Sequence, residues 1–174
     1  MMGQMTTSSP QTDAPAGRIT LDDTDRRIIA ALRADGRLSM RALAERVHIS
    51  RAGTYARVTR LEDNGVIAGY TAVTDPILAG HGVSAYVYLR IAQQSWKAVR
   101  QLISTIEEVE HAALISGDDD LALLVRATDA ASLRDLVLNR FQTMPDVLAT
   151  KTILILDELP HPRLNRTDQA IEAL

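Results

Sequence analysis

The spacing of apolar residues changes once along this chain, at a segment that contains proline and glycine (residues 74–82, TDPILAGHG). Ahead of this segment, apolar residues recur at every third or fourth position, which is the period of helices that bury one side. Directly behind it, Val83–Ile91 has an aliphatic residue at every second position. Such alternation is typical of a half-buried strand. The chain is therefore predicted to be an α+β protein in which residues 74–82 link a helical part to a part with a sheet.

Residues 18–73 are predicted to form three helices, each beginning after a residue that can accept a hydrogen bond from the first helical turn. Asp22, Ser39 and Ser50 are these capping residues, and Asp25 forms a capping-box-like pair with Asp22. Only a tight turn separates the second and third helices, and Val66–Val73 then reads as a short β-ribbon. This order predicts a winged helix-turn-helix domain. The predicted inward positions are Ile28, Ile29, Leu32, Met40, Leu43, Ala44, Val47, Thr54, Val58 and Leu61.

Residues 83–159 are predicted to form a ferredoxin-like domain with the order β-α-β-β-α-β. The predicted strands are Val83–Ile91, His111–Ser116, Leu121–Ala127 and Ala149–Leu156. The helices begin after Ser95 and after Thr128 or Asp129, with inward positions Val99, Leu102, Ile103, Ile106, Leu133, Leu136, Val137 and Phe141. Both helices should cover one face of the sheet, which leaves Tyr86 and Tyr88 on the other. An open face with large side chains favours contact with a second copy, so a homodimer is predicted.

The two ends of the chain and its composition narrow the prediction further. Residues 1–17 are polar, so we expect a disordered arm, and residues 160–174 are expected to form a C-terminal tail. The chain has no cysteine, which excludes disulfides and cysteine-ligated zinc. No apolar run approaches the ~18 residues of a membrane helix, and no secretion signal is visible. We therefore expect no membrane contact and a cytoplasmic location.

The net charge of -3 and the pI near 5.8 argue against a nucleic-acid partner if the charge is uniform along the chain. The charge is not uniform. Residues 1–64 contain ten arginines and eight acids, whereas residues 65–174 contain nine basic residues and fourteen acids. Blocks of opposite sign indicate two modules with different partners, although random surface variation is the alternative.

The outward side of the third predicted helix carries small and basic residues. Small side chains let a helix approach the major groove, and an arginine near the helix start can donate two hydrogen bonds to guanine. Arg51 and Tyr55 are therefore predicted to reach base edges, whereas Arg57 and Arg60 are predicted to contact phosphates. Ser50 adds a hydroxyl beside the positive helix end. The predicted DNA-binding residues are Ser50, Arg51, Ala52, Tyr55, Ala56, Arg57, Thr59 and Arg60.

Periodicity alone leaves two interpretations of this helix open, a DNA-binding surface or a solvated face of a module that docks on proteins. Gly53 is also ambiguous, because a glycine inside a helix costs about 1 kcal/mol relative to alanine. It either allows close approach to DNA or is simply tolerated. In a dimer, two such helices would face double-stranded DNA with a palindromic site, with half-sites about 34–36 Å apart.

Several segments resemble the Lrp/AsnC family of leucine-responsive and asparagine regulators. The similar segments are LDDTDRRIIAALRADGR (21–37), LAERVHIS (43–50), RVTRLEDNGVIAGYTAV (57–73), ISGDDDLALLV (115–125), TMPDV (143–147) and TKTILIL (150–156). The resemblance implies a transcriptional regulator with an N-terminal DNA-binding domain. It also implies a C-terminal domain that binds a small effector, commonly an amino acid, and that assembles dimers, often into octamers.

The resemblance places the effector at contacts between dimers, near the turn after the second strand of the C-terminal domain. The implied effector-binding residues are Ser116, Gly117, Asp118, Asp119, Asp120, Thr150 and Thr152. The family turn typically reads Gly-Asp-Tyr-Asp-Tyr, so this chain lacks two aromatic residues there and has one more acid. The three carboxylates either favour a cationic or ammonium-bearing ligand or form a solvated turn. His48 and Asp146 also depart from the family, at turn positions where it often has glycine.

An enzyme and a DNA-independent metabolite sensor are the rival functions. The four histidines are scattered, and the chain contains no HExxH, GxSxG, P-loop or GxGxxG motif. We therefore expect neither enzyme activity nor a cofactor or metal site. The basic third helix argues against a sensor that does not bind DNA.

Overall fold

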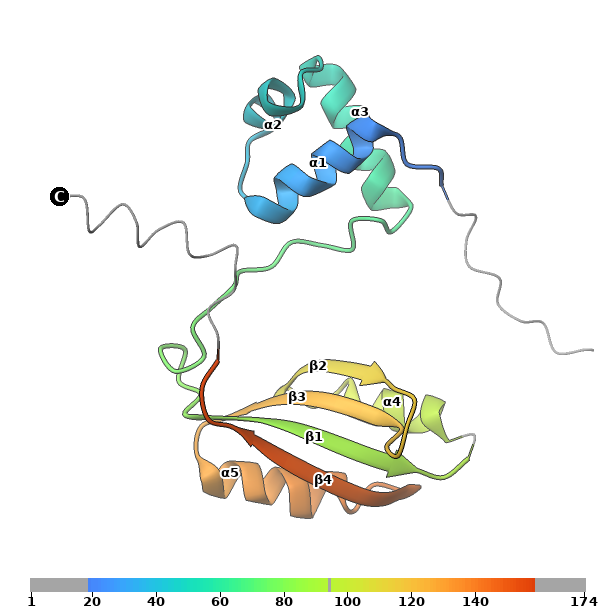
Figure 1. Ribbon diagram of the computed structural model, residues 1–174, viewed down its shortest axis with the longest axis vertical. Helices are drawn as coiled ribbons and strands as arrows, with labels where there is room; N and C mark the ends of the chain where they lie inside the picture. The colour runs from blue at the N-terminus through green and yellow to red at the C-terminus, as the bar shows by residue number, and fades with distance from the viewer. Residues whose placement is uncertain (1–18, 94, 159–174) are drawn as a thin grey trace, which may run out of the picture. The chain divides into compact units, whose positions relative to one another are not determined.

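The computed structural model describes residues 19–93 and 95–158, and the chain divides into two compact units between Ala72 and Val73 (Figure 1). The predicted arm (residues 1–17) and tail (residues 160–174) lie outside the described residues. Each unit is built around its own hydrophobic core. Separate cores are what two independently packed domains require.

Three helices form the first unit: α1 (Asp23–Ala34), α2 (Met40–Val47) and α3 (Arg51–Asp63). The predicted caps are confirmed. The Asp22 carboxylate accepts a hydrogen bond from the Asp25 backbone N–H, and the Asp25 carboxylate accepts one from the Asp22 N–H. Ser39 and Ser50 cap α2 and α3 through their hydroxyl oxygens. The buried apolar residues that hold the three helices together are Ile28, Ala31, Leu43, Val47, Val58 and Leu61.

The turn between α2 and α3 depends on the backbone of His48, which is left-handed (φ 58°, ψ 48°). The N–H groups of His48 and Ile49 both donate to the carbonyl oxygen of Ala44 at the end of α2. Histidine adopts this conformation more readily than most residues other than glycine. The helix-turn-helix therefore forms without a glycine at this position.

The β-ribbon predicted over Val66–Val73 is wrong. The segment forms no strand, and the Val66 N–H donates instead to the Leu61 carbonyl oxygen at the end of α3, at 2.8 Å. A ribbon needs a second strand to pair with, and the described part of the first unit has none. Tyr70 fixes the segment in another way, because its hydroxyl donates to Glu62 of α3 at 2.9 Å.

Residues 74–82, predicted as the linker, contain a compact turn. The Ala79 N–H donates to the Asp75 carbonyl oxygen at 2.9 Å, and the His81 N–H donates to the Pro76 carbonyl oxygen at 2.8 Å. Gly82 then passes so close to the end of the neighbouring strand that an added Cβ would lie 2.6 Å from a backbone oxygen there. Only glycine fits at this entry to the sheet.

The second unit is a four-stranded antiparallel sheet with its helices on one face (Figure 1). The strands lie side by side in the order β2-β3-β1-β4. They are β1 (Val83–Ile91), β2 (Val109–Leu114), β3 (Leu121–Ala127) and β4 (Val147–Ile155). The helices are α4 (Trp96–Ile103) and α5 (Ala130–Asp135), which continues as a π-helical segment (Leu136–Phe141). This is the predicted ferredoxin-like arrangement.

The core of the second unit lies between the helices and the sheet, as predicted from the alternation of β1. Its fully buried residues are Ala85, Val87, Leu89, Val99, Leu123, Val125 and Phe141. Leu102 was predicted to point inward and is instead 41% exposed. The buried side of α4 is formed by Val99 and Ile103, four residues apart, so Leu102 falls beside it.

β4 begins two residues earlier than predicted, directly after Asp146, whose backbone is left-handed (φ 67°).

Candidate functional site

The start of α3 presents most of the predicted DNA-binding residues to the surface. Seven of the eight are exposed, and Arg57 is half-buried. The Arg51 guanidinium lies 5.8 Å from the centre of the Tyr55 ring, close enough for a cation–π interaction. Ala52 and Ala56 are also exposed. The first two turns of α3 therefore combine small side chains with a cation that stacks on an aromatic ring.

Gly53 makes room for the cap of α3. Its N–H donates to the Ser50 hydroxyl oxygen at 3.1 Å. A Cβ on Gly53 would lie only 3.1 Å from that same oxygen, which is tighter than ordinary contact. Ser50 also borders a surface hollow of about 500 Å³ beside the helix-turn-helix, together with Arg41, Ala44, Glu45, His48, Ile49 and Arg51.

Arg57 and Arg60 are bonded to α1. The Asp25 carboxylate is fully buried, and it accepts hydrogen bonds from Arg57 Nη1 at 2.8 Å and from Arg60 Nη2 at 2.5 Å. Arg57 Nη1 also donates to Asp22 Oδ2 at 2.7 Å. We call these four residues the α1–α3 ion network. This arrangement differs from the sequence-based prediction, in which both arginines point to phosphates.

The α1–α3 ion network also shifts the pKa values of Asp22, Asp25 and Arg57. Burial raises the pKa of Asp25, but the hydrogen bonds from the Asp22 N–H and the two guanidinium groups together leave this pKa below its usual 3.8. The pKa of Asp22 is lowered to about 2, first by the Asp25 N–H and then by Arg57. The bonds to Asp22 and Asp25 raise the pKa of Arg57. Both carboxylates and the Arg57 guanidinium are therefore charged near neutral pH.

The acidic turn between β2 and β3 is tied to the sheet by two of its three carboxylates. Asp120 Oδ2 accepts a hydrogen bond from the Ile91 N–H at 2.8 Å, and Asp119 Oδ2 accepts one from Lys151 Nζ at 2.6 Å. The bond to Asp119 is the main cause of a raised pKa of Lys151. Asp118 is exposed, and within the described residues its carboxylate has no hydrogen-bond partner. The turn is thus more than a solvated loop.

Thr150 and Thr152, the other two predicted effector residues, do not join this group. In the register of the sheet they pair with Leu89 and Val87, whose side chains enter the core. Side chains alternate between the two faces of a strand, so the threonines and Lys151 lie on opposite faces of β4. The structure brings the acidic turn together with Lys151, a residue that the sequence analysis missed.

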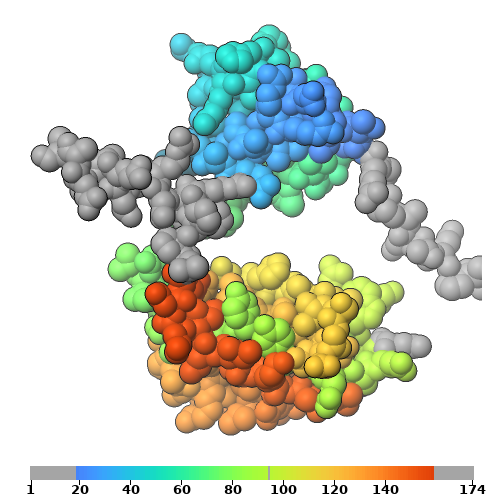
Figure 2. Space-filling model, in the orientation of Figure 1, coloured from blue at the N-terminus to red at the C-terminus, as the bar shows by residue number. Residues whose placement is uncertain are grey.

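Within the described residues of the second unit, no helix covers the other face of the sheet (Figure 2). Tyr86 is 43% exposed, and Ile153, directly opposite it on β4, is 49% exposed. The rings of Tyr86 and Tyr88 are 6.5 Å apart, and Lys151 Nζ lies 4.8 Å from the centre of the Tyr88 ring. The predicted placement of both tyrosines on an open face is confirmed.

A buried arginine also lies on this open face, and the sequence analysis missed it. Arg126 donates to Ser84 Oγ at 2.6 Å and to Glu110 Oε2 at 2.5 Å. It also pairs with both oxygens of Glu158, three residues beyond the end of β4. The bond to Glu158 is the main cause of a raised pKa of Arg126. The available signal was a charged residue inside the otherwise apolar run Leu121–Ala127.

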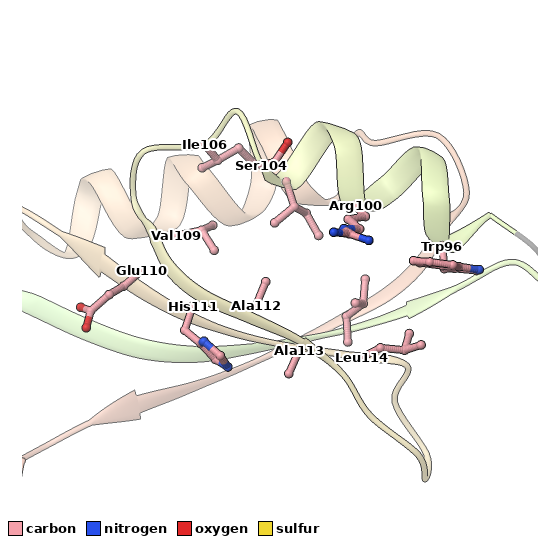
Figure 3. Close-up of a pocket in the computed structure, with 12 residues that line it drawn as sticks. Trp96, Arg100, Ser104, Ile106, Val109, Glu110, His111, Ala112, Ala113 and Leu114 are labelled. Atoms are coloured by element: carbon pink, nitrogen blue, oxygen red, sulfur yellow. The ribbon is translucent and has the colours of Figure 1, made fainter. Parts of the chain in front are cut away.

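A groove of about 420 Å³ lies between α4 and the edge strand β2 (Figure 3). Its lining includes Ile103, Val109, Leu114 and Leu121, so it is largely apolar. The Arg100 guanidinium, which also lines it, lies 6.0 Å from the centre of the Trp96 ring. The sequence did not predict this groove, because a periodic pattern shows which side of an element is buried and not the space left between two elements.

Two kinds of feature are absent from residues 19–93 and 95–158. None of the helices there has both the length and the apolar character needed to cross a membrane. The same residues contain no cluster of three histidine or carboxylate side chains that would hold a metal ion.

Comparison with known proteins gives a consistent result for both units. Residues 21–68 match the family described as winged helix-turn-helix DNA-binding, and residues 84–164 match the Lrp/AsnC ligand binding domain. The HTH-type transcriptional regulator LrpA of Mycobacterium tuberculosis is 38% identical over 136 residues, which cover 78% of this chain and 90% of that protein. The leucine-responsive regulatory protein of Escherichia coli K12 is 32% identical over 142 residues, covering 80% and 87%.

Solved structures agree. The M. tuberculosis leucine response regulatory protein superposes with a TM-score of 0.73 at 34% identity, covering 81% of this chain and 96% of that one. A transcriptional regulator of Neisseria meningitidis in complex with L-methionine has a TM-score of 0.74 at 28% identity, covering 82% and 94%. These relatives are regulators and not enzymes, as the sequence analysis expected. The chain belongs to the Lrp/AsnC family of transcriptional regulators, in which a winged helix-turn-helix domain precedes a ligand-binding domain.

Proposed function

We propose that this chain reads DNA with the start of α3 and that a small effector, an amino acid or a related metabolite, adjusts this binding through the second unit. The observation that carries the proposal is the exposed pair of Arg51 and Tyr55 beside Ala52 and Ala56. A narrow surface of small residues with one stacked cation suits insertion into the major groove. A regulator of this kind acts where the DNA is, and we place it in the cytoplasm.

The cap of α3 and three of its exposed residues have roles in this proposal. Arg51 donates two parallel hydrogen bonds to guanine O6 and N7, and Tyr55 contacts the neighbouring base or sugar. Ser50 and the first N–H groups of α3 hold a phosphate, since a helix start carries partial positive charge. Thr59, two turns along, reaches the DNA backbone with its hydroxyl.

For the effector we propose a site formed by the acidic turn and Lys151. An amino acid carries an ammonium and a carboxylate, and this site offers Asp118 to the first and the exposed Lys151 ammonium to the second. The structure of the N. meningitidis regulator with L-methionine supports an amino acid as the ligand class. Thr150 and Thr152 contribute only if a second copy supplies one of the two surfaces, as the family resemblance implies.

We further propose that the open face of the sheet forms a dimer contact and that the operator is palindromic. Tyr86 and Ile153 form an exposed apolar pair on this face, and such a patch favours a second copy. Ile153→Asp should convert the dimer, or a larger ring of dimers, to monomer in sedimentation velocity. Leu138→Asp, which places the same charge at a similarly exposed position on the helical side, is the control.

DNA binding is tested by fluorescence anisotropy with the region upstream of the chain's own gene and with a scrambled duplex. The intact chain should prefer the upstream region, and Arg51→Gln should reduce this preference about tenfold or more, since one bidentate base contact contributes about 1–3 kcal/mol. Arg33→Gln, which removes the same charge from exposed α1, should keep the preference. Effector binding with no DNA preference would instead identify a ligand-sensing module that does not bind DNA.

Effector binding is tested by a thermal-shift screen over amino acids, because a ligand of the folded state raises the apparent melting temperature. Asp118→Asn should abolish the shift, and Asp135→Asn, an exposed acid on α5, should not. Asp120 is unsuitable for this test because its carboxylate holds the end of β1. An unchanged shift in Asp118→Asn would remove the turn from the site.

A further inference from the structure

The α1–α3 ion network occupies two of the three arginines of α3. Asp25 of α1 has no solvent-accessible surface, and its two carboxylate oxygens accept from Arg57 Nη1 and Arg60 Nη2. Asp22, at the N-cap of α1, accepts a second bond from Arg57 Nη1 at 2.7 Å. The contacts join residues 32 to 35 positions apart, so they are a product of the fold and not of one helix surface.

The network also cancels charge. Two carboxylates face two guanidinium groups, so the cluster adds no net positive charge to the first unit. Arg51 differs, since its described contact is with an aromatic ring and not with an acid. The position of Arg57 agrees with this division, because its side chain is 33% exposed and lies on the flank of α3 that faces α1.

We propose that Asp22 and Asp25 set the DNA specificity of this protein by holding Arg57 and Arg60 against α1 and away from the phosphates. The inference rests on the proposed function, in which α3 faces DNA. Phosphate contacts strengthen binding to any sequence, whereas base contacts distinguish sequences. With two arginines withdrawn, non-specific affinity is low, and the base contacts of Arg51 account for a larger share of binding.

The salt dependence of non-specific binding measures this effect. Each phosphate contact makes the slope of log K against log salt more negative by about 0.9. If the salt concentration rises fourfold, one recovered contact therefore makes the loss of affinity about 3.5-fold larger. The full-length double variant Asp22→Asn/Asp25→Asn should bind a scrambled duplex more tightly at low salt, with a slope steeper by about one to two contacts. Its preference for the upstream region should fall.

Asp23→Asn is the matched control. Asp23 lies between the two acids in sequence and is exposed, and among the described residues it pairs only with Arg26 on the same helix. It removes one charge without releasing an arginine of α3, so its salt slope should equal that of the intact chain. Adding Arg57→Gln to the double variant should return the slope toward the original value. The same change in the intact chain should leave the slope unchanged.

Loss of the buried Asp25 charge is the change most harmful to folding, so Asp22→Asn alone is the second variant. Asparagine caps helices as well as aspartate does, and the change releases only one of the two bonds of Arg57. Asp22→Asn alone should also make the salt slope steeper than in the intact chain, but by less than the double variant does. Equal slopes in Asp22→Asn, Asp23→Asn and the intact chain would overturn the inference. If Arg51→Gln also fails to weaken DNA binding, α3 is not the DNA-facing helix and the proposed function fails with it.

Discussion

The two units bury opposite charges in similar surroundings. In the first unit, the buried Asp25 carboxylate is held by Arg57 and Arg60, which are both partly exposed. In the second unit, the Arg126 side chain is 10% exposed and is held by Glu110 and Glu158, whose side chains are 54% and 41% exposed. Each network has one buried centre and two partners that reach solvent.

The difference lies in what each centre can do when its partners are lost. A buried carboxylate can take up a proton and become neutral, whereas a guanidinium stays charged at any accessible pH. The Arg126 network should therefore be the more costly one to break, and acid can neutralise the buried centre only in the Asp25 network. Their positions differ too, since the first lies beside the exposed face of α3 and the second joins β1, β2, β3 and the end of β4.

The largest effect is expected from Glu110→Gln combined with Glu158→Gln, which leaves Arg126 buried and without an anionic partner. The second unit should lose about 2–3 kcal/mol of unfolding free energy, less than the ~3–5 kcal/mol of fully enclosed pairs because both glutamates reach solvent. Trp96 is the chain's single tryptophan and lies in this unit, so denaturation followed by its fluorescence reports the loss.

Glu108→Gln is the control for this experiment. Glu108 pairs with Arg140 at 3.1 Å, and the two side chains are 40% and 45% exposed, so neither charge is buried and the loss of the pair should cost less than about 1 kcal/mol. If the double variant is no less stable than Glu108→Gln, burial of the Arg126 charge is not what distinguishes the second unit.

Acid should act most directly on the first network. The pKa values of Asp22 and Asp25 are depressed in the folded chain, so their contribution to stability is complete above the usual pKa of 3.8 and is lost as the pH falls toward about 2, the pKa of folded Asp22. Thermal melts followed by the amide resonances of α1 and α3 should therefore show a falling melting temperature between about pH 4 and pH 2.

Asp22→Asn should flatten this acid dependence, because asparagine keeps the cap and has no proton to take up. Asp23→Asn should retain it. A fall of the same size in all three chains would assign the acid sensitivity to other groups.

A smaller effect separates capping from DNA contact at the start of α3. Ser50→Ala and Ser39→Ala each remove one cap hydroxyl, from α3 and α2 respectively, and each should cost the first unit about 1 kcal/mol. Ser50→Ala alone should also weaken DNA binding in anisotropy. Equal losses of DNA affinity in the two variants would show that Ser50 acts only through stability.

What the sequence predicted well depends on neighbours in the chain. The caps at Asp22, Ser39 and Ser50 act within a single helical turn, and the alternation of β1 records which face is buried. The bounds of β3 agree residue for residue with the prediction, because its apolar run is closed by turns at both ends.

What the sequence could not predict depends on contacts between distant segments. The three outward arginines of α3 look alike in a periodic pattern, and only the fold shows that Arg57 and Arg60 meet acids from α1. Lys151 reaches the acidic turn across 32 residues in the same way. The ribbon over Val66–Val73 failed for a related reason, since extended backbone becomes a strand only where a partner strand lies beside it.

The smallest effects concern the one non-glycine residue that each unit holds in the left-handed region within the described chain, His48 (φ 58°) and Asp146 (φ 67°). Glycine removes the steric cost of this conformation, about 1–2 kcal/mol for an ordinary residue and less for histidine or aspartate. Glycine also raises the conformational entropy of the unfolded chain, which lowers the stability by up to about 1 kcal/mol. His48→Gly and Asp146→Gly should therefore each stabilise their own unit by less than about 1 kcal/mol.

Denaturation of the two variants would show whether the units respond independently. Asp146→Gly should shift the Trp96 transition and leave the amide resonances of α1–α3 unchanged, and His48→Gly should do the reverse. Asn64→Gly, at a C-cap with ordinary φ of −91°, should bring no gain. A loss of stability in His48→Gly would mean that the imidazole makes contacts that offset its backbone strain, and the turn would then depend on histidine itself.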